Sequence, residues 1–186
     1  GALASHPDSL EVRTICAEAL LNRTPWKMWD LQAAVPAEDA DTLECETIIE
    51  EALSNDPRAM HHPGLLHLYV HLMEMSPYPE RALKAGDALR TLVPDAGHLT
   101  HMPTHIDVLC GHYQNVVHWN AAATKVDIKF YESNGPYTIY SGYRLHNYHF
   151  VIYGAMFLGQ LEPALRAIEG IRATTPEEML RMESPP

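Results

Sequence analysis

The sequence predicts an all-α fold, a right-handed superhelical solenoid of helix-turn-helix repeats. The main observation is a repeated histidine pair, because His67 and His71 recur as His101 and His105 after 34 residues. A 34-residue period is typical of helix-turn-helix solenoids, in which equal positions of successive repeats stack on one face. A second observation is that glycine and proline residues divide the chain at matching intervals. We therefore expect the histidines to line one concave face.

A second histidine recurrence shows an interruption of this period. His98 and His101 recur as His146 and His149 after 48 residues, which is one period plus 14 residues. The extra residues predict an insertion at 128–144, which is too long for a tight turn. The insertion could form a lid or pocket wall beside the third histidine group, or an ordered surface excursion.

The predicted elements form a single array over residues 1–186. A preceding helix is expected over 8–22, and helical pairs are expected at 26–57, 63–96, 97–127 and 145–176. The first pair would place Trp26 and Trp29 in the core and at the repeat interface, and residues 32–41 would lengthen its inter-helix loop.

The later pairs have recognisable turn and end signals. Pro63 fits the first position of a helix, and the turn of its pair is expected near residues 76–79. Turns are also expected at 111–113 and 159–161. Pro103 interrupts a predicted helix, so that the helix either starts at about Met102 or continues with a bend. The unbroken 34-residue register favours the bend.

Composition restricts the class of protein. The formal net charge of −11 argues against nucleic acid as a partner, because the phosphates would be repelled. Three cysteines without paired spacing indicate reduced thiols in a helical core. No apolar run reaches the length of a membrane span. We expect a soluble protein without membrane contact in a reducing compartment such as the cytoplasm, and a fragment, because the chain opens at Gly1 without methionine.

The histidines fall into three stripes, since residues three or four apart share one helix face. The first stripe holds His67 and His71, with Glu74 one turn further along. The second holds His98, His101 and His105, and the third holds His146 and His149. Helices that pack about 8–10 Å apart could hold an ion between such stripes.

Imidazole with one carboxylate suits a divalent transition metal such as zinc, iron or copper. The expected core ligands are His67, His71, His101 and His105, and Glu74 would be a ligand or general base. The remaining expected ligands, which would complete this ion or hold a second one, are His98, His146 and His149.

Further residues are candidates for supporting roles in the site. Tyr140, Tyr143 and Asn147 are expected to line the substrate side, and Tyr153 occupies the position that histidine fills in the other repeats. His62, which precedes Pro63, is either an extra ligand or a plain flanking residue.

Three linked motifs carry a resemblance to a known family. They are His62-Pro63-Gly64-x2-His67-x3-His71-x2-Glu74-x-Ser76, Ala96-Gly97-His98-Leu99-x-His101-Met102-Pro103-x-His105-Ile106, and His146-Asn147-x-His149-Phe150. With them, about residues 10–170 resemble a group of bacterial-type tetratricopeptide-repeat proteins. The resemblance implies the repeat fold and the histidine site, and the group has no settled activity.

The sequence therefore predicts a transition-metal-binding, tetratricopeptide-like protein with a mononuclear or dinuclear site in its concave groove. We favour a metal-dependent enzyme acting on a small molecule or peptide there, and the sequence does not separate a hydrolase from an oxygen-activating oxidoreductase. The alternative is a scaffold whose polar groove binds a peptide or protein without catalysis. Reversible metal storage is a third interpretation.

Overall fold

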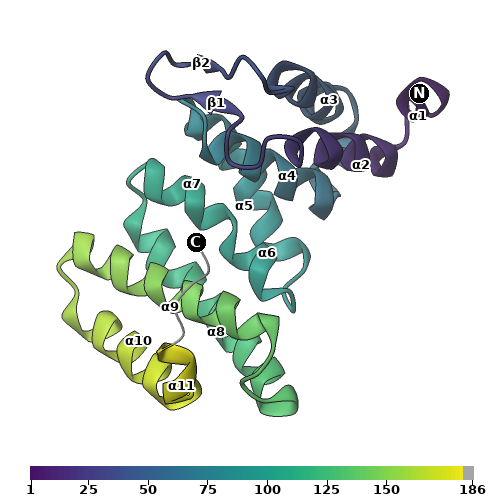
Figure 1. The fold of residues 1–186 in the computed structure, drawn as a ribbon. Coiled ribbons are helices and arrows are strands. Elements are labelled where there is room, and N and C mark those ends of the chain that lie inside the picture. Colours follow the sequence, from purple (N-terminus) through teal and green to yellow (C-terminus); the bar gives the residue numbers. More distant parts are fainter. Residues whose placement is uncertain (182–186) are drawn as a thin grey trace.

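The computed structural model describes residues 1–181 and is all-α apart from one short hairpin (Figure 1). Residues 182–186, the end of the predicted array, lie outside the described residues. The two strands are β1 (Trp29–Asp30) and β2 (Val35–Pro36), paired antiparallel. The helices are α1 (Ala2–Ser5), α2 (Leu10–Leu21), α3 (Thr42–Asn55), η1 (Pro57–His61), α4 (Pro63–Glu74), η2 (Pro79–Ala82), α5 (Leu83–Leu92), α6 (Gly97–His101), α7 (Pro103–Leu109), α8 (Tyr113–Asn134), α9 (Ile139–Leu158), α10 (Leu161–Thr174) and α11 (Glu177–Leu180).

Neighbouring helices pack against one another along the chain (Figure 1). Contacts join α2 with α3, α4 with α5, α7 with α8, α8 with α9 and α9 with α10. One apolar core lies among the helices from α2 to α7 and includes Leu66, Leu72 and Ile106. A smaller core joins α8, α9 and α10 through residues such as Val151 and Ala155. The prediction of an all-α fold is confirmed.

Local sequence signals explain several helix ends. The Ser9 hydroxyl accepts a hydrogen bond from the Val12 amide and begins α2, which confirms the helix expected over 8–22. Pro63 is the first residue of α4, as expected. Gly159 ends α9 with φ of 66°, the left-handed conformation that glycine adopts readily.

The prediction of a helical pair at 26–57 is wrong for the first helix of the pair. Instead of a helix, residues 29–36 form the β1–β2 hairpin, and only α3 and η1 follow. The Asp30 carboxylate accepts hydrogen bonds from the Gln32 and Ala33 amides and thereby closes the turn. The Trp29 indole N–H donates to the Leu72 carbonyl at 2.9 Å, so that this hairpin is attached to α4.

The insertion expected at 128–144 is also different in the structure. Helix α8 continues to Asn134 and α9 already begins at Ile139, so that the extra residues lengthen two helices. The connection is residues 135–138, where Gly135 has φ of 77°. The boundaries expected at 127 and 145 therefore fall inside helices.

Pro103 produces a break with helical geometry on both sides. Helix α6 ends at His101, Met102 keeps helical dihedral angles, and α7 begins at Pro103. Because proline has no N–H, the α-helical hydrogen bond to the Leu99 carbonyl is missing there. This arrangement agrees with the predicted bend at Pro103. The helical backbone continues from His101 to His105 through Met102.

Gly97, the first residue of α6, packs against α8. A Cβ at this position would overlap with the Asp127 carboxylate and come within 3.1 Å of the Ala123 carbonyl. We expect Gly97→Ala to destabilise the fold by about 1–3 kcal/mol, as other overpacked sites do. Thermal unfolding followed by circular dichroism would show a melting temperature several degrees lower.

Gly142 provides the matched control, because it lies within helix α9 and a Cβ there would meet no atom within 4 Å. Gly142→Ala should leave the melting temperature unchanged or raise it, since alanine is the better helix former by roughly 0.5–1 kcal/mol. Equal effects of the two substitutions would contradict the close packing of α6 on α8.

The structure also bears on the expectations of reduced cysteines and of a chain without a membrane span. Cys16, Cys45 and Cys110 are free thiols, and burial raises the pKa of Cys45 to about 12. Among residues 1–181, we found no helix with the length and apolar character needed to cross a membrane.

Candidate metal centre

Six histidines from successive helices converge into two groups of three. In each group, one nitrogen from every ring lies within 4.8 Å of the others. The first group is His67, His71 and His98, and the second group is His101, His105 and His146. Three of the predicted ligands thus come from α6 and α7, two from α4 and one from α9.

The first group joins α4 to α6. His67 and His71 lie one turn apart on α4, with ring centroids 4.5 Å apart. His98 reaches them from α6, and its Nε2 lies 3.1 Å from the Nε2 of His67. The Nδ1 atom of His98 is buried and has no hydrogen-bond partner within residues 1–181. The group can therefore present nitrogen donors to a common ion.

The second group joins α6, α7 and α9. The Nε2 atoms of His101 and His105 are 2.9 Å apart. His146 from α9 completes the group, with its ring centroid 4.8 Å from that of His101. The Phe150 ring packs against all three imidazoles at centroid distances of 4.7–4.8 Å and gives the group an apolar wall.

Glu74 connects the two groups, because its carboxylate is hydrogen-bonded to one histidine of each. Its Oε1 accepts a hydrogen bond from the Nδ1 of His71 at 2.7 Å, and its Oε2 accepts one from the Nδ1 of His105 at 2.6 Å. A carboxylate that holds the far nitrogen of a histidine fixes the ring orientation and raises its basicity toward a metal. Both oxygens of Glu74 are thus engaged by histidines, which favours a positioning role over the expected role as ligand or general base.

Asn120 on α8 fixes the orientation of His101. Its amide Nδ2 donates to the Val116 carbonyl at 2.8 Å, and a carbonyl can only accept. The amide oxygen must therefore be the atom that faces the His101 Nδ1 at 2.6 Å, so that this Nδ1 carries a proton. His101 is almost completely buried, with 1% of its surface exposed.

These hydrogen bonds determine which nitrogens carry lone pairs. In the neutral rings, the Nδ1 atoms of His101 and His105 are both donors, so that both Nε2 atoms are acceptors. Two acceptors at 2.9 Å repel each other unless a cation, either a shared proton or a metal ion, lies between or beside them. The geometry of the second group is thus suited to a cation.

Burial keeps most of these histidines neutral. Desolvation, together with repulsion from neighbouring imidazoles, lowers the pKa of His67 to about 3 and that of His98 to about 4. The same causes lower the pKa of His146 and hold that of His101 well below its usual range. Burial alone would raise the pKa of Glu74, but hydrogen bonds from His105 and His71 outweigh it and bring the pKa to about 2.

Comparisons with protein-family models, curated proteins and solved structures found no match to this chain. We therefore infer the function from the geometry of the histidine groups and of the residues around them.

One predicted ligand, His149, and the possible extra ligand, His62, lie outside both groups. His62 is the N-cap of α4, where its Nδ1 accepts the Leu65 amide hydrogen bond at 3.1 Å. This corresponds to the flanking role rather than to an extra ligand. His149 is exposed on α9, three residues beyond His146, and belongs to neither three-histidine group.

The residues expected on the substrate side have different surroundings. The Tyr143 ring lies against His98 at 4.8 Å, and Tyr140 lines a pocket of about 440 Å³ that also includes His98. Asn147 is buried and donates to the Asp127 carboxylate at 2.7 Å, which leaves it no contact with a substrate. Tyr153 packs on Phe157, with ring centroids 4.9 Å apart, outside the histidine groups.

Sequence reasoning missed three residues of the site. Phe150 could have been found, because it lies four residues after His146 and so shares its helix face. Asn120 gave no signal, since only tertiary packing brings α8 against α6. Trp26 was expected in the core, but 70% of its surface is exposed.

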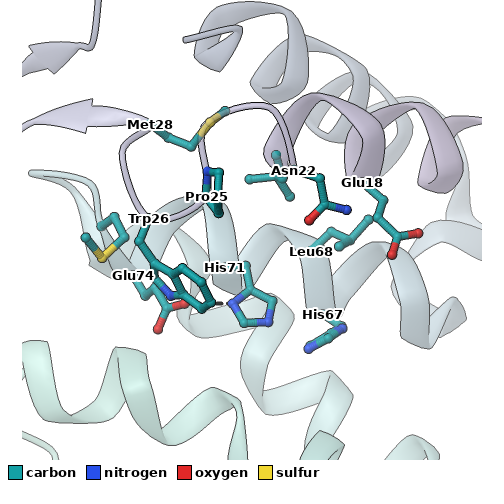
Figure 2. Close-up of a pocket in the computed structure, with 11 residues that line it drawn as sticks. Glu18, Asn22, Pro25, Trp26, Met28, His67, Leu68, His71 and Glu74 are labelled. Atoms are coloured by element: carbon teal, nitrogen blue, oxygen red, sulfur yellow. Dashed lines mark hydrogen bonds and ion pairs between the residues drawn. The ribbon is translucent and has the colours of Figure 1, made fainter. Parts of the chain in front are cut away.

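Trp26 lines a pocket above the first group (Figure 2). The pocket has a volume of about 230 Å³ and includes His67, His71 and Glu74 in its lining. Figure 2 shows that residues of α2 and of the loop after it line one side of the pocket, and that residues of α4 line the opposite side. The first group is therefore adjacent to a space that can hold a small molecule.

Proposed function

We propose that this protein binds two divalent transition-metal ions, one in each three-histidine group. We further propose that it is an enzyme whose catalysis depends on these ions. The observation that carries this proposal is the second group, in which the Nε2 acceptors of His101 and His105 face each other at 2.9 Å. His146 supplies a third nitrogen to the same place.

The donor set restricts the kind of ion. Three imidazoles suit zinc, iron or copper, whereas calcium and magnesium require oxygen ligands. Protein sites that use a metal for catalysis commonly supply three ligands and leave another position open to water or substrate. Each group has this number of histidines, and the choice between hydrolysis and oxygen activation depends on the metal.

Glu74 supports a coupled pair of sites rather than two unrelated ones. It is a single carboxylate, with 8% of its side-chain surface exposed, that holds one histidine of each group. Binding in one group orders Glu74 and so favours the correct orientation of the histidine in the other group. The coupling requires no bridging ligand.

We further infer that the helical pairs belong to a right-handed, superhelical, tetratricopeptide-like array. The pairs α4–α5, α6/α7–α8 and α9–α10 support this inference, because the histidine-bearing helix comes first in each. The 34-residue period agrees with the same arrangement. The concave face of such an array would contain both metal sites.

Metal analysis of untagged protein tests the proposal. We expect about two equivalents of transition metal per chain, and a chelator should lower the melting temperature, because bound ligand stabilises the native state by about 2.7 kcal/mol at a hundredfold excess over Kd. Less than a tenth of an equivalent, with no chelator effect, would instead favour a peptide-binding scaffold. Several weakly held equivalents without turnover would favour metal storage.

A further inference from the structure

The pocket above the first group has one wall from α4 and another from α2 and the loop that follows it. Its lining is mainly apolar and includes Trp26, Met28 and Leu68. His67 and His71 form part of the same lining (Figure 2). A volume of about 230 Å³ corresponds to about eight water molecules, at about 30 Å³ each, or to an organic molecule of about eight to ten non-hydrogen atoms.

Trp26 is held in a conformation that packing of the core does not explain. Its backbone has φ of 56°, which is rare for a bulky residue and costs on the order of 1–3 kcal/mol. Its indole is 70% exposed and lines the pocket beside the first group. Strained residues with exposed aromatic rings are typical of ligand-binding positions, where the ring gains a partner on binding.

The charges around the pocket determine what it can accept. Glu18 and Glu74 are in its lining, and no lysine or arginine lines it within the described part of the chain. Asn22 lies one turn after Glu18 on the same side of α2 and adds an amide to the rim. In the absence of a bound metal ion, a carboxylate or phosphate ligand would be repelled there, whereas an ammonium group would be attracted to Glu18.

We propose that this pocket binds a small apolar or aromatic amine, which is the substrate class of the first metal site. The apolar body packs against Trp26 and Met28 and extends toward His67 and His71. The amino group lies at the rim, near Glu18 and Asn22. The role as substrate rests on the proposed metal-dependent function, but binding in the pocket does not require the metal.

Titration calorimetry with 2-phenylethylamine tests the pocket, with phenylacetate as an anion of similar size. We expect the amine to bind the full-length chain at least tenfold more tightly than the acid. Trp26→Ala should weaken amine binding at least tenfold, and Trp26→Phe should restore most of it. The alanine variant keeps the Cβ and therefore the backbone strain, so that its fold should be unchanged.

Two control variants locate the effect. Tyr153→Ala removes another exposed aromatic ring outside both histidine groups and should leave the affinity unchanged. Glu18→Gln should weaken the amine but not neutral benzyl alcohol. Equal affinity for amine and acid, no detectable amine binding, or equal affinity of wild type and Trp26→Ala would each overturn the proposal.

Metal content measured on the same samples separates the two proposals. Amine binding that depends on Trp26, in purified protein that contains no metal and takes up none when it is added, would support the pocket and contradict the metal function. Two bound ions without amine binding would support the metal function and contradict the pocket. The titration is repeated after chelator treatment so that direct coordination of the amine by a metal cannot account for the result.

Discussion

Replacing His146 with alanine is expected to remove one of the two metal equivalents. His146 supplies the only ligand from α9 to the second group, and loss of one of three imidazoles leaves His101 and His105 as an incomplete site. Substitution of a residue that only hydrogen-bonds to a metal ligand already lowers the metal affinity by about 10–100-fold. Loss of the ligand itself should therefore weaken the second site by at least about 100-fold, measured as metal content after dialysis.

His149→Ala is the matched control for this prediction. Both histidines are exposed on α9, three residues apart, and the sequence alone predicted both as ligands. His149 lies outside both groups, so its loss should leave two equivalents bound. Circular dichroism should be the same for both variants. Equal metal loss in the two, or none in His146→Ala, would contradict the assignment of the second group.

The 34-residue period in the sequence located the histidine-bearing helices well. It predicted the turns at 76–79, 111–113 and 159–161, because helix breakers and the histidine positions share one register. Six of the seven predicted histidine ligands converge for this reason. Periodicity reports which residues share a face, and this information is sufficient to predict a histidine-lined surface.

Periodicity could not predict how the histidines divide into groups. The repeat relates His67 to His101, yet the structure pairs His67 with His98 and joins His101 to His146. His98 and His101 lie on the same short helix but contact different neighbours, His67 of α4 and His146 of α9. This partition depends on how the helices pack against one another, which the sequence does not encode locally.

The N-terminal prediction failed for a related reason. A large residue such as Trp29 fits the expected helix position, and the repeat pattern was therefore extended to 26–57. The hairpin is instead favoured by the turn that the Asp30 carboxylate closes. It is also favoured by the hydrogen bond that the Trp29 indole donates to the Leu72 carbonyl. The second of these is a contact between residues 43 positions apart. Local pattern cannot reveal such a contact.

Replacing Glu74 with glutamine is expected to prevent both metal sites from being fully occupied at the wild-type affinity. Glutamine keeps one carbonyl oxygen, which can accept from only one of His71 and His105, and its amide N–H₂ must face the other. That histidine must then use Nδ1 as an acceptor, so that its proton moves to Nε2. A protonated Nε2 cannot bind a metal, and the affected site loses a ligand.

Because the amide can turn either way, the first ion should bind with little loss at either site, and the second ion should then bind about 10–100-fold more weakly, as is usual when a residue that hydrogen-bonds to a metal-binding histidine is changed. Isothermal titration with zinc into metal-free protein would measure both affinities. Glu46→Gln is the control, since Glu46 is another shielded carboxylate, paired with Arg81 outside the histidine groups. If both ions bound Glu74→Gln as tightly as they bind the wild type, Glu74 would not position the histidines of both groups, and the proposed coupling would be wrong.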